Sequence, residues 1–297
     1  MCVDLHTHSI FSDGTATPEE LVHMAALLKL SGLSLTDHDT LEGYERAAAA
    51  GRQHGIKIIP GLEISCTHGD FSLHILGYLV DPDHHLLREK LLLIQNGRQQ
   101  RNRKIVERLV DLGIDITGAE LKTLSSCGQT GRPHIARLLM SKKIVPDINS
   151  AFRRYLGKGK PAYAERFSFT AAETIAFIHQ AGGVAVLAHP GKLDSSMRAQ
   201  PRLIHELVER GLDGLEIYYP SHPRKMQKKL HRLADQYDLL KTGGSDYHGG
   251  NRPNNGLAGG RKSVCPPDTI MEELHTRGQN IRSNRFGYTK IGQTSPN

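Results

Sequence analysis

Two histidines and an aspartate lie close together near the start of the chain. His6 and His8 are two residues apart at the end of a predicted short strand that begins at residue 2. Side chains two apart on a strand point to the same face, so both imidazoles could hold one divalent cation. Asp13 follows in a glycine-containing loop that can fold back and aim a carboxylate at the same point. The spacing indicates a metal site, although two histidines near a terminus can equally be ordinary solvated residues.

Further histidines and carboxylates come directly after predicted strands, or in adjacent loops, along the whole sequence. The complete set is His6, His8, Asp13, His38, Glu63, His74, His189, Asp246 and His248. Each of them alone has an ordinary structural explanation, but nine at comparable positions do not. Nine ligands suffice for two or three cations that share a bridging carboxylate. Imidazole with carboxylate favours Mn, Fe or Zn over Ca or Mg.

Helix and strand patterns alternate through most of the chain. Strands are predicted over residues 33–35, 56–62, 184–188, 214–218 and 239–242, and residues 64–67 and 71–79 predict a hairpin-like pair. Helices are predicted over residues 17–30, 41–54, 170–180, 200–210, 222–237 and 268–277, the first of them capped by Thr17 and followed by Pro18. About seven such units imply a largely parallel sheet that closes into a barrel or winds doubly. In a barrel, polar groups at the carboxyl ends of the strands converge on one face.

The middle of the chain has a different character. A long helix is predicted over residues 84–112, and the mainly helical pattern continues to about residue 166. Residues 88–166 contain 17 Lys and Arg against 7 Asp and Glu, whereas the rest of the chain carries a net charge of −3. We therefore expect a barrel domain formed by residues 1–87 and 167–297, with a basic helical subdomain inserted at 88–166. The excess charge favours a polyanionic or phosphorylated partner, and a solvated helical surface explains it equally well.

Composition excludes several classes of protein. The 297 residues are 38% hydrophobic, which is ample for a sizeable core. No run of about 18 apolar residues exists that could span a membrane. A cleavable signal peptide would remove His6 and His8, and the four cysteines are far apart without a CxxC motif. We expect reduced thiols, a cytoplasmic location and no obligate protein partner.

Six motifs together resemble those of the PHP (polymerase and histidinol phosphatase) phosphoesterases. They are DLHTHSIFSDG, TDHD, GLEIS, HILGY, AHPGK and GGSDYH, in this order and across nearly the whole chain. The resemblance implies a distorted (βα)7 TIM-like barrel with three divalent metal ions, manganese foremost, on its C-terminal face. It also implies how the ligands divide. His6, His8, Glu63 and Asp246 would hold one ion, Glu63 would bridge to a second completed by His74 and His189, and Asp13, His38 and His248 would hold the third.

The position of the basic segment and its GRPHIAR stretch narrow this resemblance further. Both are similar to PHP members that act on nucleoside 3′,5′-bisphosphates and trim short 5′-phosphorylated RNA from its 5′ end. The implied function is a metal-dependent phosphatase that removes the 3′-phosphate of a bisphosphate such as pAp, with 5′→3′ exoribonuclease action on short RNA as a further activity. A metal-activated hydroxide held by His6, His8, Glu63 and Asp246 would attack the phosphorus directly.

Four polar residues of the basic segment are candidates for binding the substrate. Arg132 and His134 are two apart at a predicted helix start, where free backbone N–H groups also favour a phosphate. Arg101 and Asn102 on the long helix are further candidates. Two alternatives remain open. A histidinol-phosphate phosphatase is disfavoured because a basic segment would repel the cationic amine, and a non-catalytic domain that binds metal and RNA has no need of so many ligands.

Overall fold

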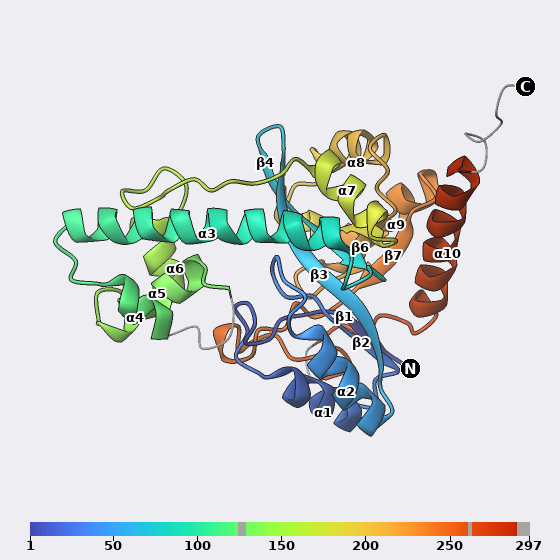
Figure 1. The fold of residues 1–297 in the computed structure, drawn as a ribbon, viewed down its shortest axis with the longest axis horizontal. Helices are drawn as coiled ribbons and strands as arrows, with labels where there is room; N and C mark the ends of the chain where they lie inside the picture. Colours follow the sequence, from blue (N-terminus) through green and yellow to red (C-terminus); the bar gives the residue numbers. More distant parts are fainter. Residues whose placement is uncertain (124–128, 261–262, 290–297) are drawn as a thin grey trace, which may run out of the picture.

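The computed structural model describes residues 1–123, 129–260 and 263–289. Its centre is a curled seven-stranded sheet in which the strands follow one another in sequence order (Figure 1). The strands are β1 (Val3–Thr7), β2 (Gly32–Leu35), β3 (Lys57–His68), β4 (Phe71–Tyr78), β5 (Val184–Leu187), β6 (Gly214–Tyr218) and β7 (Leu240–Gly243). The α-helices are α1 (Pro18–Leu27), α2 (Tyr44–His54), α3 (His85–Asp111), α4 (Gly118–Thr123), α5 (Arg132–Ser141), α6 (Ile148–Ala151), α7 (Ala171–Gln180), α8 (Gln200–Val208), α9 (Arg224–Gln236) and α10 (Ile270–Thr289). Three short turns are the π-helical η1 (Phe152–Leu156) and the 3₁₀ helices η2 (Pro190–Lys192) and η3 (Gly249–Asn251).

The two ends of the sheet approach each other where the first and last strands end. Strands β1, β2 and β3 are mutually parallel, β4 runs antiparallel to both β3 and β5, and β5, β6 and β7 are again parallel. An isolated parallel bridge joins Thr7 to Tyr247, and the N–H of Asp246 donates to the His6 carbonyl at 2.8 Å. The expected mixed α/β fold around a curled seven-stranded sheet is therefore confirmed.

The third strand is longer than the sequence pattern indicated. Residues 56–62 and 64–67 were expected to be separate strands, but β3 is continuous from Lys57 to His68. Its first half pairs in parallel with β2, and its second half pairs antiparallel with β4. Because β3 changes its pairing partner along its length, its residue pattern resembles that of two separate strands. Glu63 consequently lies within a strand and not at its end.

Helices cover the sheet in separate groups. Helices α1 and α2 pack against each other and against the β2–β3 side, whereas α7, α8 and α9 cover the other side, with α10 at the right of Figure 1. Helix α3 leaves the sheet, and α4, α5 and α6 lie along its far half. None of the described helices is both long and apolar enough to cross a bilayer.

The basic middle segment has a hydrophobic cluster of its own. Ile105 and Leu109 of α3 pack with Ile135 and Leu139 of α5 and with Leu156, and these side chains are buried. The predicted long helix over 84–112 is confirmed as α3. A separate cluster is what an inserted subdomain needs, because its apolar side chains must be buried without help from the sheet. The boundaries at residues 88 and 166 stay a prediction.

The helix ends show where local sequence rules held. The Thr17 hydroxyl accepts the Glu20 N–H at 3.2 Å and the Glu20 carboxylate accepts the Thr17 N–H at 2.7 Å, so the predicted cap of α1 is confirmed. The last helix was predicted to end at residue 277, which is wrong, since α10 continues to Thr289. Gly278 lies inside α10. A Cβ at this position would come within 3.1 Å of the Leu79 side chain, so glycine allows the helix to pack closely against Leu79.

A disulfide contradicts the expectation that all cysteines are reduced thiols. Cys2 and Cys265 are bonded although 263 residues separate them in sequence. The curl of the sheet brings the start of β1 beside the segment that follows β7, where the Val3 N–H donates to the Pro266 carbonyl at 3.0 Å. Cys66 is free and buried, and Cys127 lies outside the described residues. The wide spacing of the cysteines in the sequence therefore led to a wrong prediction for Cys2 and Cys265.

Reducing this disulfide should destabilise the protein. Because the bond closes a very long loop, its loss should lower the free energy of unfolding by about 2–4 kcal/mol. Guanidinium unfolding with and without dithiothreitol measures the difference. A Cys2→Ser/Cys265→Ser variant serves as the control, since its midpoint should match that of the reduced protein and should not respond to the reductant. Equal midpoints for oxidised and reduced wild type would contradict the prediction.

Candidate metal centre

The structure brings all nine predicted ligands together at one end of the sheet. They come from both sides of the basic segment: His6 on β1 and His8 just after it, Asp13 in the following loop, His38 after β2, Glu63 on β3, His74 on β4, His189 after β5, and Asp246 and His248 after β7. Their nitrogen and oxygen atoms form four overlapping groups, each with its atoms within 4.8 Å of one another. These groups are His8–Asp13–His38–His248, His6–Glu63–His189, His6–His8–Asp246 and His38–Glu63–His74. We refer to the nine side chains as the histidine–carboxylate cluster.

Glu63 is at the centre of this cluster. One carboxylate oxygen lies 2.7 Å from His74 Nδ1 and 3.0 Å from His189 Nε2. The other lies 3.0 Å from His38 Nδ1 and 3.3 Å from His8 Nε2. The Glu63 side chain is 1% exposed. Because both oxygens face imidazoles, this carboxylate belongs to two of the four groups.

Two aspartates complete the cluster on either side of His8. Asp246 Oδ1 lies 3.2 Å from His8 Nε2 and 3.4 Å from His6 Nε2. Asp13 Oδ1 lies 3.1 Å from His248 Nε2. Each aspartate therefore contributes an oxygen to a different part of the cluster, as more than one cation would require.

Several buried atoms of the cluster lie near an oppositely charged group but form no hydrogen bond of acceptable geometry. They are His6 Nε2, His8 Nε2, Asp13 Oδ1, His38 Nδ1 and His248 Nε2. A buried polar atom left without a partner costs about 1–3 kcal/mol, so several together need an explanation. Divalent cations would supply the missing partner, and imidazole with carboxylate is a donor set suited to first-row transition metals. The residues present thus fit a metal centre.

The electrostatics of the cluster favour ionised carboxylates. Burial opposes ionisation of Glu63 and Asp246, yet the neighbouring imidazoles hold the pKa of each carboxyl well below its usual range. Burial also disfavours a charge on His8, but Asp246 and Glu63 outweigh it and raise the pKa of His8 to about 9. Burial lowers the pKa of His189 to about 3, so that this imidazole is neutral. The His8 proton would have to leave when a cation binds, because a metal ligand must be deprotonated.

Unusual backbone conformations aim the residues at the strand ends. His189, Asp246 and Asp39 all have positive φ angles, of 32°, 52° and 56°. Such conformations are unfavourable for residues other than glycine and persist where the surrounding structure holds them. At Gly244, a Cβ would come within 2.4 Å of the His6 backbone nitrogen, so the close approach of β1 and the β7 loop requires glycine. The close approach of β1 and the loop after β7 also places Asp246 beside His6 and His8.

A buried carboxylate that the sequence reasoning missed holds two of the ligands. The Glu216 carboxylate accepts a hydrogen bond from His6 Nδ1 at 2.8 Å and another from the His189 N–H at 2.7 Å. A carboxylate behind a ligating histidine fixes its tautomer and raises its basicity. One signal could have revealed it, because GLEI occurs twice, at residues 61–64 and 214–217.

Another missed carboxylate fixes the loop that carries Asp13. Asp37 accepts the Ser9 N–H at 2.7 Å, the Ser9 hydroxyl at 2.6 Å and the Ser12 hydroxyl at 2.5 Å. Asp37 is buried, so these three bonds satisfy it. The loop after β1 is thereby attached to the end of β2, which sets the position of Asp13.

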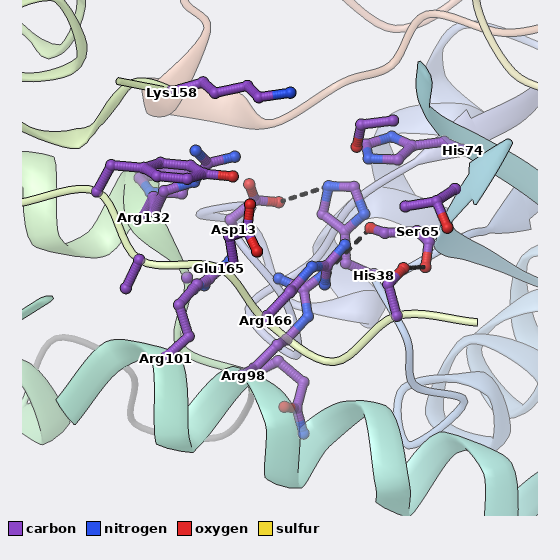
Figure 2. A pocket seen from close by; sticks show the side chains of 18 of the residues that line it. Asp13, His38, Ser65, His74, Arg98, Arg101, Arg132, Lys158, Glu165 and Arg166 are labelled. Atoms are coloured by element: carbon purple, nitrogen blue, oxygen red, sulfur yellow. Dashed lines mark hydrogen bonds and ion pairs between the residues drawn. The ribbon is translucent and has the colours of Figure 1, made fainter. Parts of the chain in front are cut away.

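A cavity of about 470 Å³ opens beside the cluster (Figure 2). Its lining includes three members of the cluster, Asp13, His38 and His74, together with the cations Arg98, Arg101, Arg132, Lys158, Arg166 and Arg252. Figure 2 shows Arg98 and Arg101 rising from α3, with Arg132 and Lys158 across the cavity and His38 and His74 at its other end. We call this cavity the arginine pocket. Its charge suits a phosphate or another compact anion.

The cations that line this pocket outnumber its described acidic residues, Asp13, Asp70 and Glu165. Asp39 forms ion pairs with Arg98 and, at 3.4 Å, with Arg166. Arg101 donates to the neutral Asn102 amide oxygen at 2.9 Å. Burial and the nearby guanidinium groups of Arg98 and Arg166 lower the pKa of Arg101 to about 8. Since guanidinium groups stay protonated in proteins, the low pKa indicates a local shortage of negative charge that a bound anion would relieve.

The four predicted substrate residues divide into two pairs. Arg101 and Arg132 belong to the lining of the arginine pocket, whereas Asn102 and His134 are not among its described lining residues. The Asn102 amide donates to a backbone carbonyl 2.9 Å away, and His134 Nδ1 accepts the Gly131 N–H at 3.1 Å as a cap of α5. Their contact with substrate remains a prediction.

Three other arginines of this pocket, Arg98, Arg166 and Arg252, were missed by the sequence reasoning. Arg98 lies one helical turn before Arg101 on α3, a spacing that puts both on one face and could have revealed it. Arg166 follows the helical segment and has no local signal of this kind.

Comparison with known proteins gives similarity over nearly the whole chain. A model of the PHP domain matches residues 4–110. The chain is 35% identical over 279 residues to a 3′,5′-nucleoside bisphosphate phosphatase of Chromobacterium violaceum, covering 93% of this chain and 97% of that one. It is 34% identical over 247 residues to the 5′-3′ exoribonuclease Rnm of Salmonella typhimurium, covering 82% and 84%. A crystal structure of a proposed metal-dependent phosphoesterase from Bifidobacterium adolescentis matches with a TM-score of 0.83 and 32% identity, covering 93% and 96%.

Removing the charge of Glu216 should weaken metal binding. Glu216→Gln keeps the size of the side chain but no longer stabilises the His6 tautomer that directs Nε2 into the cluster. We expect the affinity for Mn²⁺ to fall about 10- to 100-fold, measured by competition with a chelating dye. Glu209→Gln is the matched control, because Glu209 is exposed just after α8. Wild-type affinity in Glu216→Gln would contradict the role given to this carboxylate.

Proposed function

The chain belongs to the PHP-domain family and is a metal-dependent phosphoesterase, and from this premise we propose that it removes the 3′-phosphate from nucleoside 3′,5′-bisphosphates such as pAp. We also propose 5′→3′ exoribonuclease action on short 5′-phosphorylated RNA. One relative described above is a bisphosphate phosphatase and another is an exoribonuclease, and each is similar over at least 82% of this chain. The two activities break the same bond, between phosphorus and a 3′-oxygen.

The observation that supports this substrate best is that one cavity contains both an anion site and part of the cluster. Asp13, His38 and His74 line the same space as Arg101 and the other arginines. A nucleoside bisphosphate has two phosphates on one sugar, so one can lie at the cluster while the other lies among the guanidinium groups. Hydrogen bonds between ionised partners are about twice as strong as neutral ones, which favours a doubly charged ligand here.

We propose that the cluster holds three divalent metal ions, with manganese as the first choice and iron or zinc as alternatives. The proposed division is His6, His8, Glu63 and Asp246 for one ion, Glu63, His74 and His189 for a second, and Asp13, His38 and His248 for the third. When bound, such ions neutralise the charge of the phosphate and lower the pKa of the attacking water.

The side chains of the chain itself have definable tasks in this reaction. Glu216 holds His6 so that Nε2 points into the cluster, and Glu63 presents its two oxygens to opposite sides of it. Arg101 and Arg132 bind the phosphate that is not hydrolysed and so keep the 3′-oxygen in place. Water attacks the phosphorus, the bond to the 3′-oxygen breaks and a proton passes to that oxygen. Nothing in this scheme needs a covalent intermediate on serine or cysteine.

We propose that the curled sheet is the distorted (βα)7 barrel of the family and that residues 88–166 form an inserted subdomain. The bridge between Thr7 and Tyr247 and the separate hydrophobic cluster of the basic segment support this description. We also propose a cytoplasmic location. The Cys2–Cys265 disulfide counts against it, because disulfides are rare in cytosolic proteins.

The alternative substrate histidinol phosphate is less consistent with the arginine pocket. Its ammonium group would have to lie near Arg98, Arg101 and Arg132, where like charges repel it. A non-catalytic metal-binding domain is the remaining alternative.

A phosphate-release assay distinguishes these functions. Purified protein with Mn²⁺ should release phosphate from adenosine 3′,5′-bisphosphate but not from histidinol phosphate, because only the former supplies a second anion. Release from histidinol phosphate alone would contradict the proposal, and release from neither would favour the non-catalytic domain.

His8→Ala should abolish turnover while leaving the fold intact by circular dichroism. His54→Ala, at an exposed histidine near the end of α2, should behave as wild type.

Loss of one arginine should affect only substrates with a second phosphate. Arg132→Ala should raise KM for the bisphosphate about 10- to 100-fold, the value of one charge-assisted hydrogen bond, and should change turnover of an aryl phosphate little. Steady-state kinetics on both substrates measure the ratio. Arg103→Ala is the matched control, since Arg103 is exposed on α3. Equal losses on both substrates would show that Arg132 does not bind the substrate.

A further inference from the structure

A second cavity lies beside the residues that contact Asp246 Oδ2. It measures about 390 Å³ and is formed by Lys192 after β5, by residues 219–221 after β6 and by Arg252, Asn254 and Asn255 after β7. This volume falls within the range of about 300–1,000 Å³ that is usual for small-molecule sites. Its lining includes Lys192 and Arg252, and none of the described residues that line it is acidic.

The second cavity is joined to the cluster through one carboxylate. Asp246 Oδ1 faces His6 and His8, whereas its Oδ2 accepts hydrogen bonds from the Tyr219 hydroxyl at 2.7 Å and from Lys192 at 3.0 Å. The Arg252 guanidinium also pairs with Oδ2. Lys192, Arg252 and the Tyr219 hydroxyl thus contact the cluster through the Asp246 oxygen that does not face His6 and His8.

Arg252 belongs to both cavities. It is part of the lining of the arginine pocket and of the second cavity, and its side chain is 39% exposed. The cluster is therefore flanked by two cationic spaces that meet at one arginine.

The chemistry of the proposed reaction gives the second space a use. In hydrolysis of a 3′-phosphate, the bond from water oxygen to phosphorus forms, the bond from phosphorus to the 3′-oxygen breaks, and the nucleotide in the arginine pocket leaves with a new 3′-hydroxyl. The phosphoryl group that goes to water carries no other substituent in a bisphosphate. In an RNA strand the same phosphoryl group is esterified to the next nucleotide, which must have room beyond Asp246.

We propose that the second cavity binds the first nucleotide of the remaining strand when the substrate is 5′-phosphorylated RNA. This inference rests on the proposed function, since it locates the leaving strand of the proposed exoribonuclease reaction. The cleavage yields a nucleoside 5′-phosphate and a strand one nucleotide shorter that again carries a 5′-phosphate. That product has the end group that the arginine pocket binds.

Recognition in this cavity depends on the backbone of the strand and not on its bases. Lys192 and Arg252 provide charge for phosphate, and Asn254 adds an exposed amide for the sugar. Tyr219 is 2% exposed and uses its hydroxyl on Asp246, so its ring offers no face for stacking. Binding of single strands through stacking needs accessible aromatic faces. The cavity should therefore accept any base.

Filling the cavity with a bulky side chain tests the proposal. Ser221 is exposed at the rim and takes no part in the cluster, so Ser221→Trp obstructs the cavity without altering Asp246 or its partners. Asn254→Trp does the same from another loop, in case the first variant does not fold. Ser283→Trp on the exposed side of α10 is the matched control.

Two measurements on each variant separate the possible outcomes. Fluorescence anisotropy with Mn²⁺ gives the affinity for a 3′-labelled, 5′-phosphorylated RNA tetramer whose first linkage is a non-hydrolysable phosphonate, and phosphate release gives kcat/KM for adenosine 3′,5′-bisphosphate. Ser221→Trp should weaken tetramer binding at least about tenfold, which corresponds to the loss of one charge-assisted contact. It should leave kcat/KM for the bisphosphate within about twofold of the wild-type value.

Other results would overturn the inference. Unchanged tetramer binding in both cavity variants would mean that the strand lies elsewhere. Equal losses for tetramer and bisphosphate would indicate a general defect or a cavity that only releases inorganic phosphate. If wild type does not hydrolyse the bisphosphate at all, the proposed function fails, whereas the anisotropy comparison still reports on the cavity.

Discussion

The buried Glu63 carboxylate is the group on which the rest of the site depends. It lies within β3, where the strand changes from pairing with β2 to pairing with β4, and both of its oxygens face imidazoles. A carboxylate removed from water without compensation costs several kcal/mol. The imidazoles of His38, His74 and His189, within 3.0 Å of the Glu63 oxygens, provide this compensation.

Asp39 connects this acidic centre to the basic part of the molecule. Its carboxylate accepts the Ser65 N–H on the sheet at 3.0 Å and pairs with Arg98 from α3 and Arg166 from the end of the basic segment. These contacts orient α3 so that its arginines face the cluster and not solvent. One buried aspartate thus fixes Arg98 and Arg166 of the arginine pocket relative to the sheet that carries the cluster.

The segment after β7 closes the molecule on the opposite side of the centre. It carries Asp246 and Arg252, and it is held to β1 by the Cys2–Cys265 disulfide and by the Val3–Pro266 hydrogen bond. The bridge between Thr7 and Tyr247 and the hydrogen bond from the Asp246 N–H to the His6 carbonyl join the same two ends of the sheet. The curl of the sheet explains why one carboxylate can face the histidines with one oxygen and two cations with the other.

The sequence by itself determined the nine members of the cluster, the cap at Thr17 and the long basic helix, because strand alternation, helix periodicity and capping are properties of neighbouring residues. It did not determine the roles of Glu216, Arg98 and Arg166 or the disulfide. Local patterns tell which face of a strand or helix a residue occupies, but not which distant element covers that face. Only the curl of the sheet brings residues 210 apart, such as His6 and Glu216, into contact, and the tertiary structure alone decided those partners.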